Sequence, residues 1–183
     1  SSDADSIGRL VLSNLERFGY DGEIYLVSRN NREINGRPCV AGIDELPEGI
    51  DAAMIGLAAS GIREAVIACG RRGIGTAVVF AAGFAETGEG GKAAQAAMVE
   101  AAREAKVALC GPNCIGYMNL IDGAALSFDV LAAKRADARP GVGIIAQSGA
   151  MQTSLRLALL AKELNLTYSI STGNEADLAA EDF

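Results

Sequence analysis

The chain has 183 residues, of which 50% are hydrophobic and 21% are charged, and its formal net charge is −7. This length and composition are typical of one large or two small globular domains, and they exclude a disordered or collagen-like chain. The sequence contains no histidine. A Ser-His-Asp triad, a Cys-His pair and a His-ligated zinc or haem site are therefore excluded for this chain acting alone.

The charge pattern also bears on partners and compartment. No cluster of lysines or arginines forms a basic patch, so neither a nucleic acid nor an anionic membrane surface is expected as a partner. No apolar run reaches the roughly 18 to 20 residues of a membrane helix, and the acidic start SSDADS is unlike a signal peptide. The four cysteines match no disulfide or zinc spacing. The sequence predicts a cytoplasmic protein with reduced thiols and no metal site.

Short apolar runs alternate with amphipathic segments along the chain. Helices are predicted over 6–18, 60–72, 90–105 and 150–164, with Ser6 and Ser60 as N-caps of the first two. Strands are predicted over 23–28, 51–58, 75–83, 106–111, 141–149 and 167–173. The polar stretch 29–38 is predicted to be a loop.

Nearly continuous apolar strands separated by helices predict an α/β fold with a doubly wound parallel sheet. The alternation lapses between about Gly116 and Pro140 and then restarts with a new strand. We therefore expect a first domain over 1–116, a linker over 117–140 and the start of a second domain over 141–183. The first unit opens on a helix and the second stops after two strands, so a chain truncated at both ends is expected.

Ligands of doubly wound folds bind at the carboxyl ends of the strands. In this sequence those ends are rich in Gly, Ser, Thr and Asn, which offer backbone N–H groups and hydroxyls to a phosphorylated ligand. The segments concerned are 28–30, 57–60, 82–88, 111–116, 147–150 and 171–174.

A purely structural interpretation is open for each motif. The segment 82–91 could be a surface turn that caps the next helix, Cys114 a small buried hydrophobe, and Ser148 only an N-cap. A serine-hydrolase elbow is excluded, because Ala146 stands where its first glycine belongs and no histidine could activate Ser148. The dinucleotide-binding motif GxGxxG is absent.

Four motifs in a fixed order carry a family resemblance: AGFAETGEGG (82–91), GPNCIGYMN (111–119), IIAQSGA (144–150) and STGNEADLAAEDF (171–183). Their order and separation resemble those of the nucleoside-diphosphate-forming acyl-CoA synthetases, which include succinyl-CoA synthetase alpha subunits and ADP-forming acetyl-CoA synthetases. The resemblance covers essentially the whole chain. It implies a Rossmann-like CoA-binding domain over 1–116 and the start of a flavodoxin-like ligase domain over 141–183.

The resemblance implies a reaction of a carboxylic acid, CoA and ATP that gives acyl-CoA, ADP and phosphate through an acyl-phosphate and a phosphohistidine. That histidine is expected beyond Phe183, so no catalytic residue lies in this chain. ATP and Mg²⁺ are expected to bind an ATP-grasp domain or subunit outside it, within an oligomer. The motifs do not identify the acid.

The resemblance also implies roles for individual residues. Ser148, Gly149 and Ala150 would open the helix that receives the phosphate, a position where helix N–H groups and the helix dipole favour anions. Asn174 and Asp177 would lie near the phosphohistidine. Arg29 stands where the family has proline, and Cys114 is expected to be structural. The residues implied for CoA binding are Ser2, Ser6, Ser28, Arg29, Asn30, Ala58, Ser60, Gly83, Phe84, Glu86, Asn113 and Cys114.

Two other functions stay open at this point. One is a CoA-binding regulatory module without ligase activity, and the other is an NAD-binding Rossmann fragment. We expect no synthetase turnover from the 183 residues alone.

Overall fold

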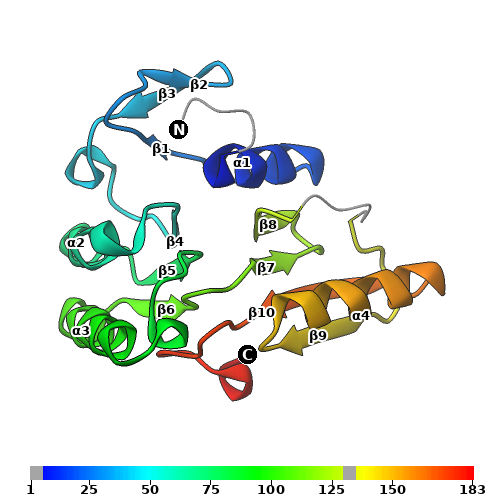
Figure 1. Cartoon of the computed structure of the whole chain (residues 1–183). Coiled ribbons are helices and arrows are strands. Elements are labelled where there is room, and N and C mark those ends of the chain that lie inside the picture. Colours follow the sequence, from blue (N-terminus) through cyan, green and yellow to red (C-terminus); the bar gives the residue numbers. More distant parts are fainter. Residues whose placement is uncertain (1–5, 130–134) are drawn as a thin grey trace.

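The computed structural model describes residues 6–129 and 135–183, and Figure 1 shows its helices and strands. The helices are α1 (Ile7–Arg17), α2 (Ala59–Arg71), α3 (Glu89–Ala105) and α4 (Gly149–Ala161), with 3₁₀ turns η1 (Ile43–Glu45), η2 (Ala85–Thr87) and η3 (Ala180–Asp182). The strands are β1 (Leu26–Val27), β2 (Glu33–Ile34), β3 (Arg37–Val40), β4 (Ala52–Ile55), β5 (Thr76–Val79), β6 (Ala108–Cys110), β7 (Gly116–Asn119), β8 (Ala124–Ser127), β9 (Val142–Ala146) and β10 (Leu166–Ser171). Every helix and strand predicted above is present.

The central parallel sheet has the order β4-β5-β6 and is covered on both faces. Apolar residues of α2 and α3 pack on one face, where Val66 and Met98 meet Val79 in one buried cluster. On the other face, Val11 of α1 packs with Val78 and its neighbours. Helices on both faces of a parallel sheet define the doubly wound α/β class, so the predicted fold class is confirmed.

A small hairpin replaces the loop that was predicted over 29–38. Strands β2 and β3 pair antiparallel across Asn35 and Gly36, whose φ angles are +51° and +76°. An Asn-Gly pair with two positive φ angles is the preferred two-residue hairpin turn. Strand β3 then pairs in parallel with β1, so the three strands form a separate sheet with the order β1-β3-β2.

The segment expected as a linker, 117–140, also contains sheet structure. Strands β7 and β8 form an antiparallel hairpin, and β7 pairs with β10 in a sheet of order β8-β7-β10-β9. Two strands in succession have no helix between them, which explains why the alternation of strands and helices lapses there. The described part of 117–140 is thus a piece of the second sheet, whereas the domain boundaries stay a prediction.

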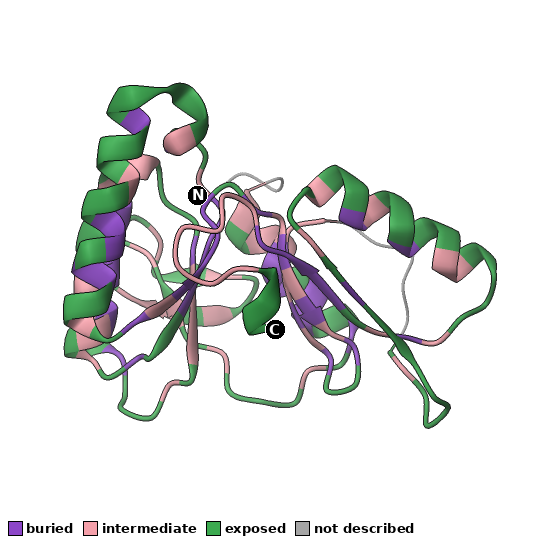
Figure 2. Cartoon of the chain, turned by 90° about the horizontal axis from the view of Figure 1, so that it is seen from below, coloured by how far each residue is buried: buried purple, intermediate pink, exposed green. Residues whose placement is uncertain are grey.

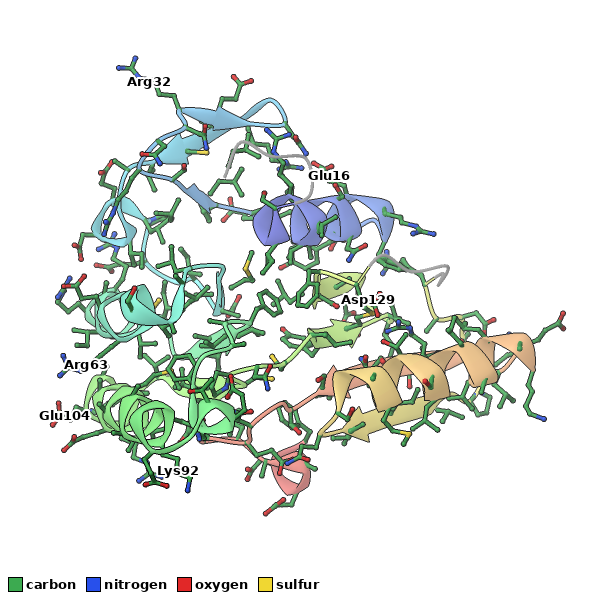
Figure 3. The ribbon with its side chains drawn as sticks, viewed as in Figure 1. Glu16, Arg32, Arg63, Lys92, Glu104 and Asp129 are labelled. Carbon is green, nitrogen blue, oxygen red and sulfur yellow. The ribbon has the colours of Figure 1, made fainter. Side chains whose placement is uncertain are left out.

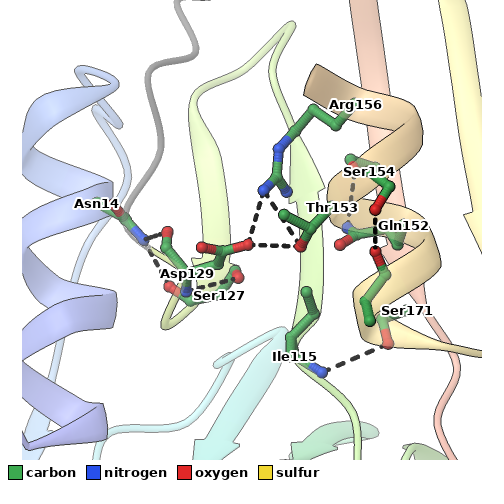
Figure 4. Close-up of polar contacts among 11 residues, drawn as sticks. Asn14, Ile115, Ser127, Asp129, Gln152, Thr153, Ser154, Arg156 and Ser171 are labelled. Carbon is green, nitrogen blue, oxygen red and sulfur yellow. Dashed lines mark hydrogen bonds and ion pairs between the residues drawn. The ribbon is translucent and has the colours of Figure 1, made fainter. Parts of the chain in front are cut away.

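Helix α1 contributes to the cores of the central sheet β4-β5-β6 and of the second sheet β8-β7-β10-β9, which together are called the two larger sheets. Its Val11 and Leu15 pack beside Phe80 of the central sheet, whereas Phe18 at its C-terminus packs on Met118 and Ile144 of the second sheet. Asn14 also donates hydrogen bonds to the backbone oxygens of Ser127 and Asp129, at 2.7 and 3.0 Å. Figure 4 shows how these contacts join α1 to the end of β8.

The chain crosses from the second sheet to the edge of the first after β10. The N–H groups of Asn174, Ala176 and Leu178 donate to the backbone oxygens of Pro112, Gly111 and Leu109, at 2.9, 3.2 and 3.1 Å. Leu109 N in turn donates to the carboxylate of Asp177 at 3.0 Å. Residues 174–178 therefore lie along β6 and hold the two sheets together.

Helix α4 covers the second sheet in an unusual way. Within α4, all of which is described, the buried residues are Gln152 and Arg156, and Figure 2 shows the rest of the helix mainly as exposed or intermediate. The Arg156 side chain is 0% exposed and its Nη2 lies 2.6 Å from Asp129 Oδ2. The Asp129 side chain is partly exposed, at 26%, whereas Figure 3 shows Arg32, Arg63, Lys92 and Glu104 pointing outward. No helix among the described residues is long and apolar enough to cross a membrane.

Candidate functional site

A pocket of about 720 Å³ lies where the two larger sheets meet. Its walls come from the segments that follow β5, β6, β9 and β10, so it sits at the carboxyl ends of parallel strands in both sheets. The lining residues are Phe80, Ala82, Ala85, Glu86, Asn113, Cys114, Ile115, Phe128, Gln147, Ser148, Gly149, Ala150, Gly173 and Asn174.

One wall of the pocket is the N-terminus of α4. Ser148 is the N-cap of this helix, and its Oγ accepts a hydrogen bond from Met151 N at 3.3 Å. Gly149 lies close to Ile115, because a Cβ built there would be 2.9 Å from Ile115 Cγ2. The first N–H groups of a helix have no acceptor within the helix. Gly149 and Ala150 therefore offer backbone donors to an anion, as their predicted role requires.

The opposite wall carries one carboxylate whose oxygens are held in place. Glu86 Oε1 accepts from the N–H groups of Gly83 and Phe84, at 2.5 and 3.1 Å, and Oε2 accepts from Asn174 Nδ2 at 2.6 Å. Burial raises the pKa of Glu86, but the bonds from Asn174, Gly83 and Phe84 outweigh it and lower that pKa to about 2. Glu86 is thus ionised at neutral pH.

Asn174 connects the walls. Besides donating to Glu86, its Nδ2 donates to Gln95 Oε1 at 3.0 Å, and its Oδ1 accepts from Asn113 Nδ2 at 3.2 Å. These partners follow β5, lie in α3 and follow β6, respectively. Among the described residues that line the pocket, none is a lysine or arginine. Amides, backbone N–H groups and the start of α4 are therefore the donors available to an anionic ligand.

Cys114 lines the pocket but is only 2% exposed. Its Sγ donates to Val79 O at 3.4 Å, which ties the loop after β6 to the end of β5. The neighbouring Cys110 has a raised pKa, because of its contact with the Cys114 thiol and its burial. These contacts hold the loop after β6 in place, whereas the role of Cys114 towards a ligand stays a prediction.

The structure brings together seven of the residues singled out from the sequence. Some of them were implied for CoA binding and others for phosphate binding, and both sets line this one pocket. The seven residues are Glu86, Asn113, Cys114, Ser148, Gly149, Ala150 and Asn174.

Other predicted residues surround the pocket or lie apart from it. Gly83 and Phe84 offer their N–H groups to Glu86, and a Cβ on Gly83 would lie 3.5 Å from Ala59 Cβ at the start of α2. The residues that lie near the starts of α1 and α2 or just after β1 are Ser6, Ser28, Arg29, Asn30, Ala58 and Ser60. Ser2 falls outside the described residues.

One local expectation is wrong, and the structure adds detail to two others. Ser60 is not the N-cap of α2, because Ala58 occupies that position with extended φ and ψ angles. Ser6 is the N-cap of α1 but makes no capping hydrogen bond through its side chain. The carboxylate of Asp177 accepts from Leu109 N at the edge of β6 and does not line the pocket, and its place near the phosphohistidine stays a prediction.

Sequence reasoning missed several lining residues. Phe80 and Phe128 form an edge-to-face pair, with ring centroids 5.3 Å apart, on the apolar side of the pocket. Neither belongs to a motif, so nothing in the sequence connects them. Gln95, which does not line the pocket but accepts from the lining residues Ala85 and Asn174, was also missed, although it is the one uncharged polar side chain in the Ala-rich helix α3. Such an isolated polar residue was the available signal.

The described residues contain no group of three or more His, Cys, Asp or Glu side chains placed to hold a metal ion. The pocket does suit the parts of a CoA molecule. Phe80, Phe128 and Ile115 give it an apolar side for an aliphatic arm, and the start of α4 gives it donors for a charged group.

Comparisons with known proteins agree with this geometry. Residues 1–119 match the protein family described as a CoA binding domain. The chain is 34% identical over 179 residues to a trans-feruloyl-CoA synthase from an unknown prokaryotic organism, a match that covers 97% of this chain and 25% of that protein. It is 31% identical over 182 residues to the alpha subunit of the ADP-forming acetate–CoA ligase II of Pyrococcus furiosus, covering 100% of this chain and 38% of that subunit.

A solved structure shares the fold. The dinucleotide-forming acetyl-coenzyme A synthetase 1 of Candidatus Korarchaeum cryptofilum, in complex with phosphate and ADP, has a TM-score of 0.86 and 28% sequence identity. The superposition covers 98% of this chain and 37% of that one. These matches confirm the family resemblance predicted from motif order. The chain spans 25% to 38% of the length of these three relatives.

Proposed function

Because the chain belongs to the CoA-binding-domain family, we propose that it is the CoA-binding part of an ADP-forming acid–CoA ligase. The observation that carries this proposal is a pocket that lies at the carboxyl ends of parallel strands from both larger sheets. There the segment around Glu86 and Asn113 faces the start of α4. Similarity to a feruloyl-CoA synthase and an acetate–CoA ligase subunit supports the reaction class.

In this proposal the loops of the central sheet bind CoA, and the start of α4, beside the second sheet, binds a phosphate. The segments after β1, β4 and β5, together with the start of α1, would hold the nucleotide and the pantetheine arm, and Asn113 would lie near the thiol. CoA supplies the thiol that accepts the acyl group. The residues assigned to CoA are those predicted above, including Ser2, Ser6, Ser28, Arg29, Asn30, Ala58 and Ser60.

The start of α4 would hold a phosphate through the N–H groups of Gly149 and Ala150. Ser148 keeps this helix start ordered by accepting from Met151 N. The phosphate would come from a phosphohistidine outside this chain. ATP and Mg²⁺ would bind an ATP-grasp domain or subunit of the same assembly, placed in the cytoplasm. Four free cysteines among the described residues are consistent with a reducing compartment.

Calorimetric titration of the natural full-length protein tests the proposal. We expect CoA to bind and NAD not to bind, and acid, CoA and ATP together should yield ADP and acyl-CoA. Binding of NAD without CoA would overturn the assignment. Binding of CoA without ADP formation would instead identify a regulatory module. The 183-residue chain alone should give no acyl-CoA.

A second experiment tests the role of α4. In the full-length protein, Ser148→Asp would place a negative charge at the start of α4, against the incoming phosphate. We expect labelling of the protein by radioactive ATP to fall at least about ten-fold, the change that roughly 1.4 kcal/mol produces. Unchanged labelling would exclude this helix as the phosphate site.

A further inference from the structure

Gln95 has no role in the assignments above, yet it contacts both walls of the pocket. It lies in α3 and is partly buried, and its Oε1 accepts from Ala85 N at 3.3 Å and from Asn174 Nδ2 at 3.0 Å. Ala85 belongs to the segment after β5, and Asn174 to the segment after β10. One side-chain oxygen therefore bonds to a residue on each side.

Asn174 has a defined orientation only because two acceptors lie beside its Nδ2. Its two amide hydrogens go to Glu86 Oε2 and Gln95 Oε1, and its Oδ1 faces the donor Asn113 Nδ2. A flipped amide would place Oδ1 against two acceptors and Nδ2 against a donor. Gln95 and Glu86 thus fix the amide of Asn174 together.

The amide of Asn174 also holds the Glu86 carboxylate in place, and its backbone neighbour joins it to the second sheet. Through Glu86 it holds the carboxylate on the N–H groups of Gly83 and Phe84, in the segment assigned to CoA. The backbone next to Asn174 is bonded to the second sheet, because Gly173 N donates to Gln147 O at 3.1 Å, beside the start of α4. The bonded set Gln95–Asn174–Glu86 thus runs continuously from one wall to the other.

We propose that Gln95 is a positioning residue that, through Asn174 and Glu86, couples the CoA wall of the pocket to the phosphate wall. A ligand on either wall favours the hydrogen-bonded arrangement of this shared set over arrangements in which its bonds are broken, so the second ligand binds a protein in which that arrangement is more populated. Binding of a phosphate then tightens binding of CoA, and CoA tightens binding of the phosphate by the same factor. The inference rests on the proposed function.

Calorimetry on the natural full-length protein tests the coupling. The Kd for CoA is measured at pH 7 with and without saturating inorganic phosphate. The ratio of the two Kd values should be at least about five-fold in the unmodified protein, the lower end of ordinary couplings. It should fall below about two-fold in Gln95→Ala, because both acceptor contacts are removed.

Two further variants make the test specific. Lys92→Ala makes the same change one turn earlier in α3, at a side chain that is 62% exposed and bonds to Glu89, so it should keep the full ratio. Gln95→Glu keeps an oxygen that can accept both bonds and should restore a ratio above about three-fold. Alanine is the best helix former, and α3 is already rich in it, so Gln95→Ala should fold.

The outcomes separate this inference from the proposed function. If the unmodified protein does not bind CoA, the proposed function fails. If it binds CoA but phosphate leaves the Kd unchanged, or if Gln95→Ala keeps the full ratio, the coupling by Gln95 is wrong while the proposed function stands.

Discussion

A single side-chain amide helps to lower the pKa of the carboxylate at the pocket. Glu86 is exposed, and its low pKa depends on three short hydrogen bonds rather than on a neighbouring cation. Two of its donors are backbone N–H groups that no substitution of a side chain removes directly. Asn174 is the donor that can be changed, so it controls how firmly the carboxylate is held.

Asn174→Leu should therefore raise the pKa of Glu86 from about 2 towards its ordinary value of 4.5. Titration of the Glu86 carboxyl carbon by NMR measures this shift. Since the folded pKa lies below the unfolded one, the ionised group contributes stability fully above about pH 4.5, and that contribution is lost as the pH falls towards 2. In the variant, the folded and unfolded pKa values of Glu86 should lie closer together, so the pH range over which this contribution is lost should be narrower. A Glu86 pKa that stays near 2 would contradict the role of Asn174.

At the scale of elements, the ion pair between Arg156 and Asp129 beneath α4 is expected to contribute strongly to the free energy of unfolding. Arg156 is 0% exposed and is paired with Asp129, which also accepts from Thr153 Oγ1 at 2.8 Å. Among the described residues, Arg156 Nε and Nη1 find no other partner. Loss of Asp129 would leave a buried, unpaired charge, and it would remove the contact that joins α4 to the segment after β8.

Asp129→Ala should accordingly lower the free energy of unfolding by about 3 kcal/mol, the usual cost of breaking a buried pair from one side. Urea unfolding measures the change. Asp44→Ala is the control, because Asp44 pairs with Arg71 at 69% and 60% exposure, where such pairs contribute about 0–1 kcal/mol. Equal effects of the two variants would show that the Arg156 pair does not hold α4.

The elements that sequence reasoning predicted correctly are those with a strong hydrophobic period, and those it missed are hairpins. The stretch 29–38 is too polar to suggest strands, yet its Asn35-Gly36 pair was a hairpin signal. Strand β7 pairs with its neighbour β8 and also with β10, which lies far along the sequence, so this second partner could not be identified from the residues of β7 and β8 alone. In the site, glycine-rich motifs could be predicted, whereas Phe128 and Gln95 reach it only through tertiary packing.

At the scale of the whole molecule, the two larger sheets meet where Gly173 passes Pro112. Gly173 has a φ of +63°, and a Cβ there would lie 2.2 Å from Pro112 O. The crossing therefore requires glycine for two reasons, the backbone conformation and the close approach of another backbone.

Gly173→Ala should cost about 3 kcal/mol in the free energy of unfolding, because the conformational strain of about 1 kcal/mol is joined by a backbone clash. The matched control is Gly36→Ala, where φ is +76° and nothing lies within 4 Å of the added Cβ. Chemical unfolding of both variants separates the two contributions. Similar losses would mean that the sheets can shift apart at no cost.

The bonds that hold residues 174–178 along β6 have a consequence for sequence change. Three of them join main-chain atoms only, so the side chains of Ala176 and Leu178 can vary without breaking them. Length is another matter, because deletion of one residue between Gly173 and Asp177 would shift the N–H groups that donate to the backbone of residues 109–112 out of register. Substitutions at Leu178 should be tolerated, whereas insertions and deletions should move Asn174 away from Glu86 and open the pocket.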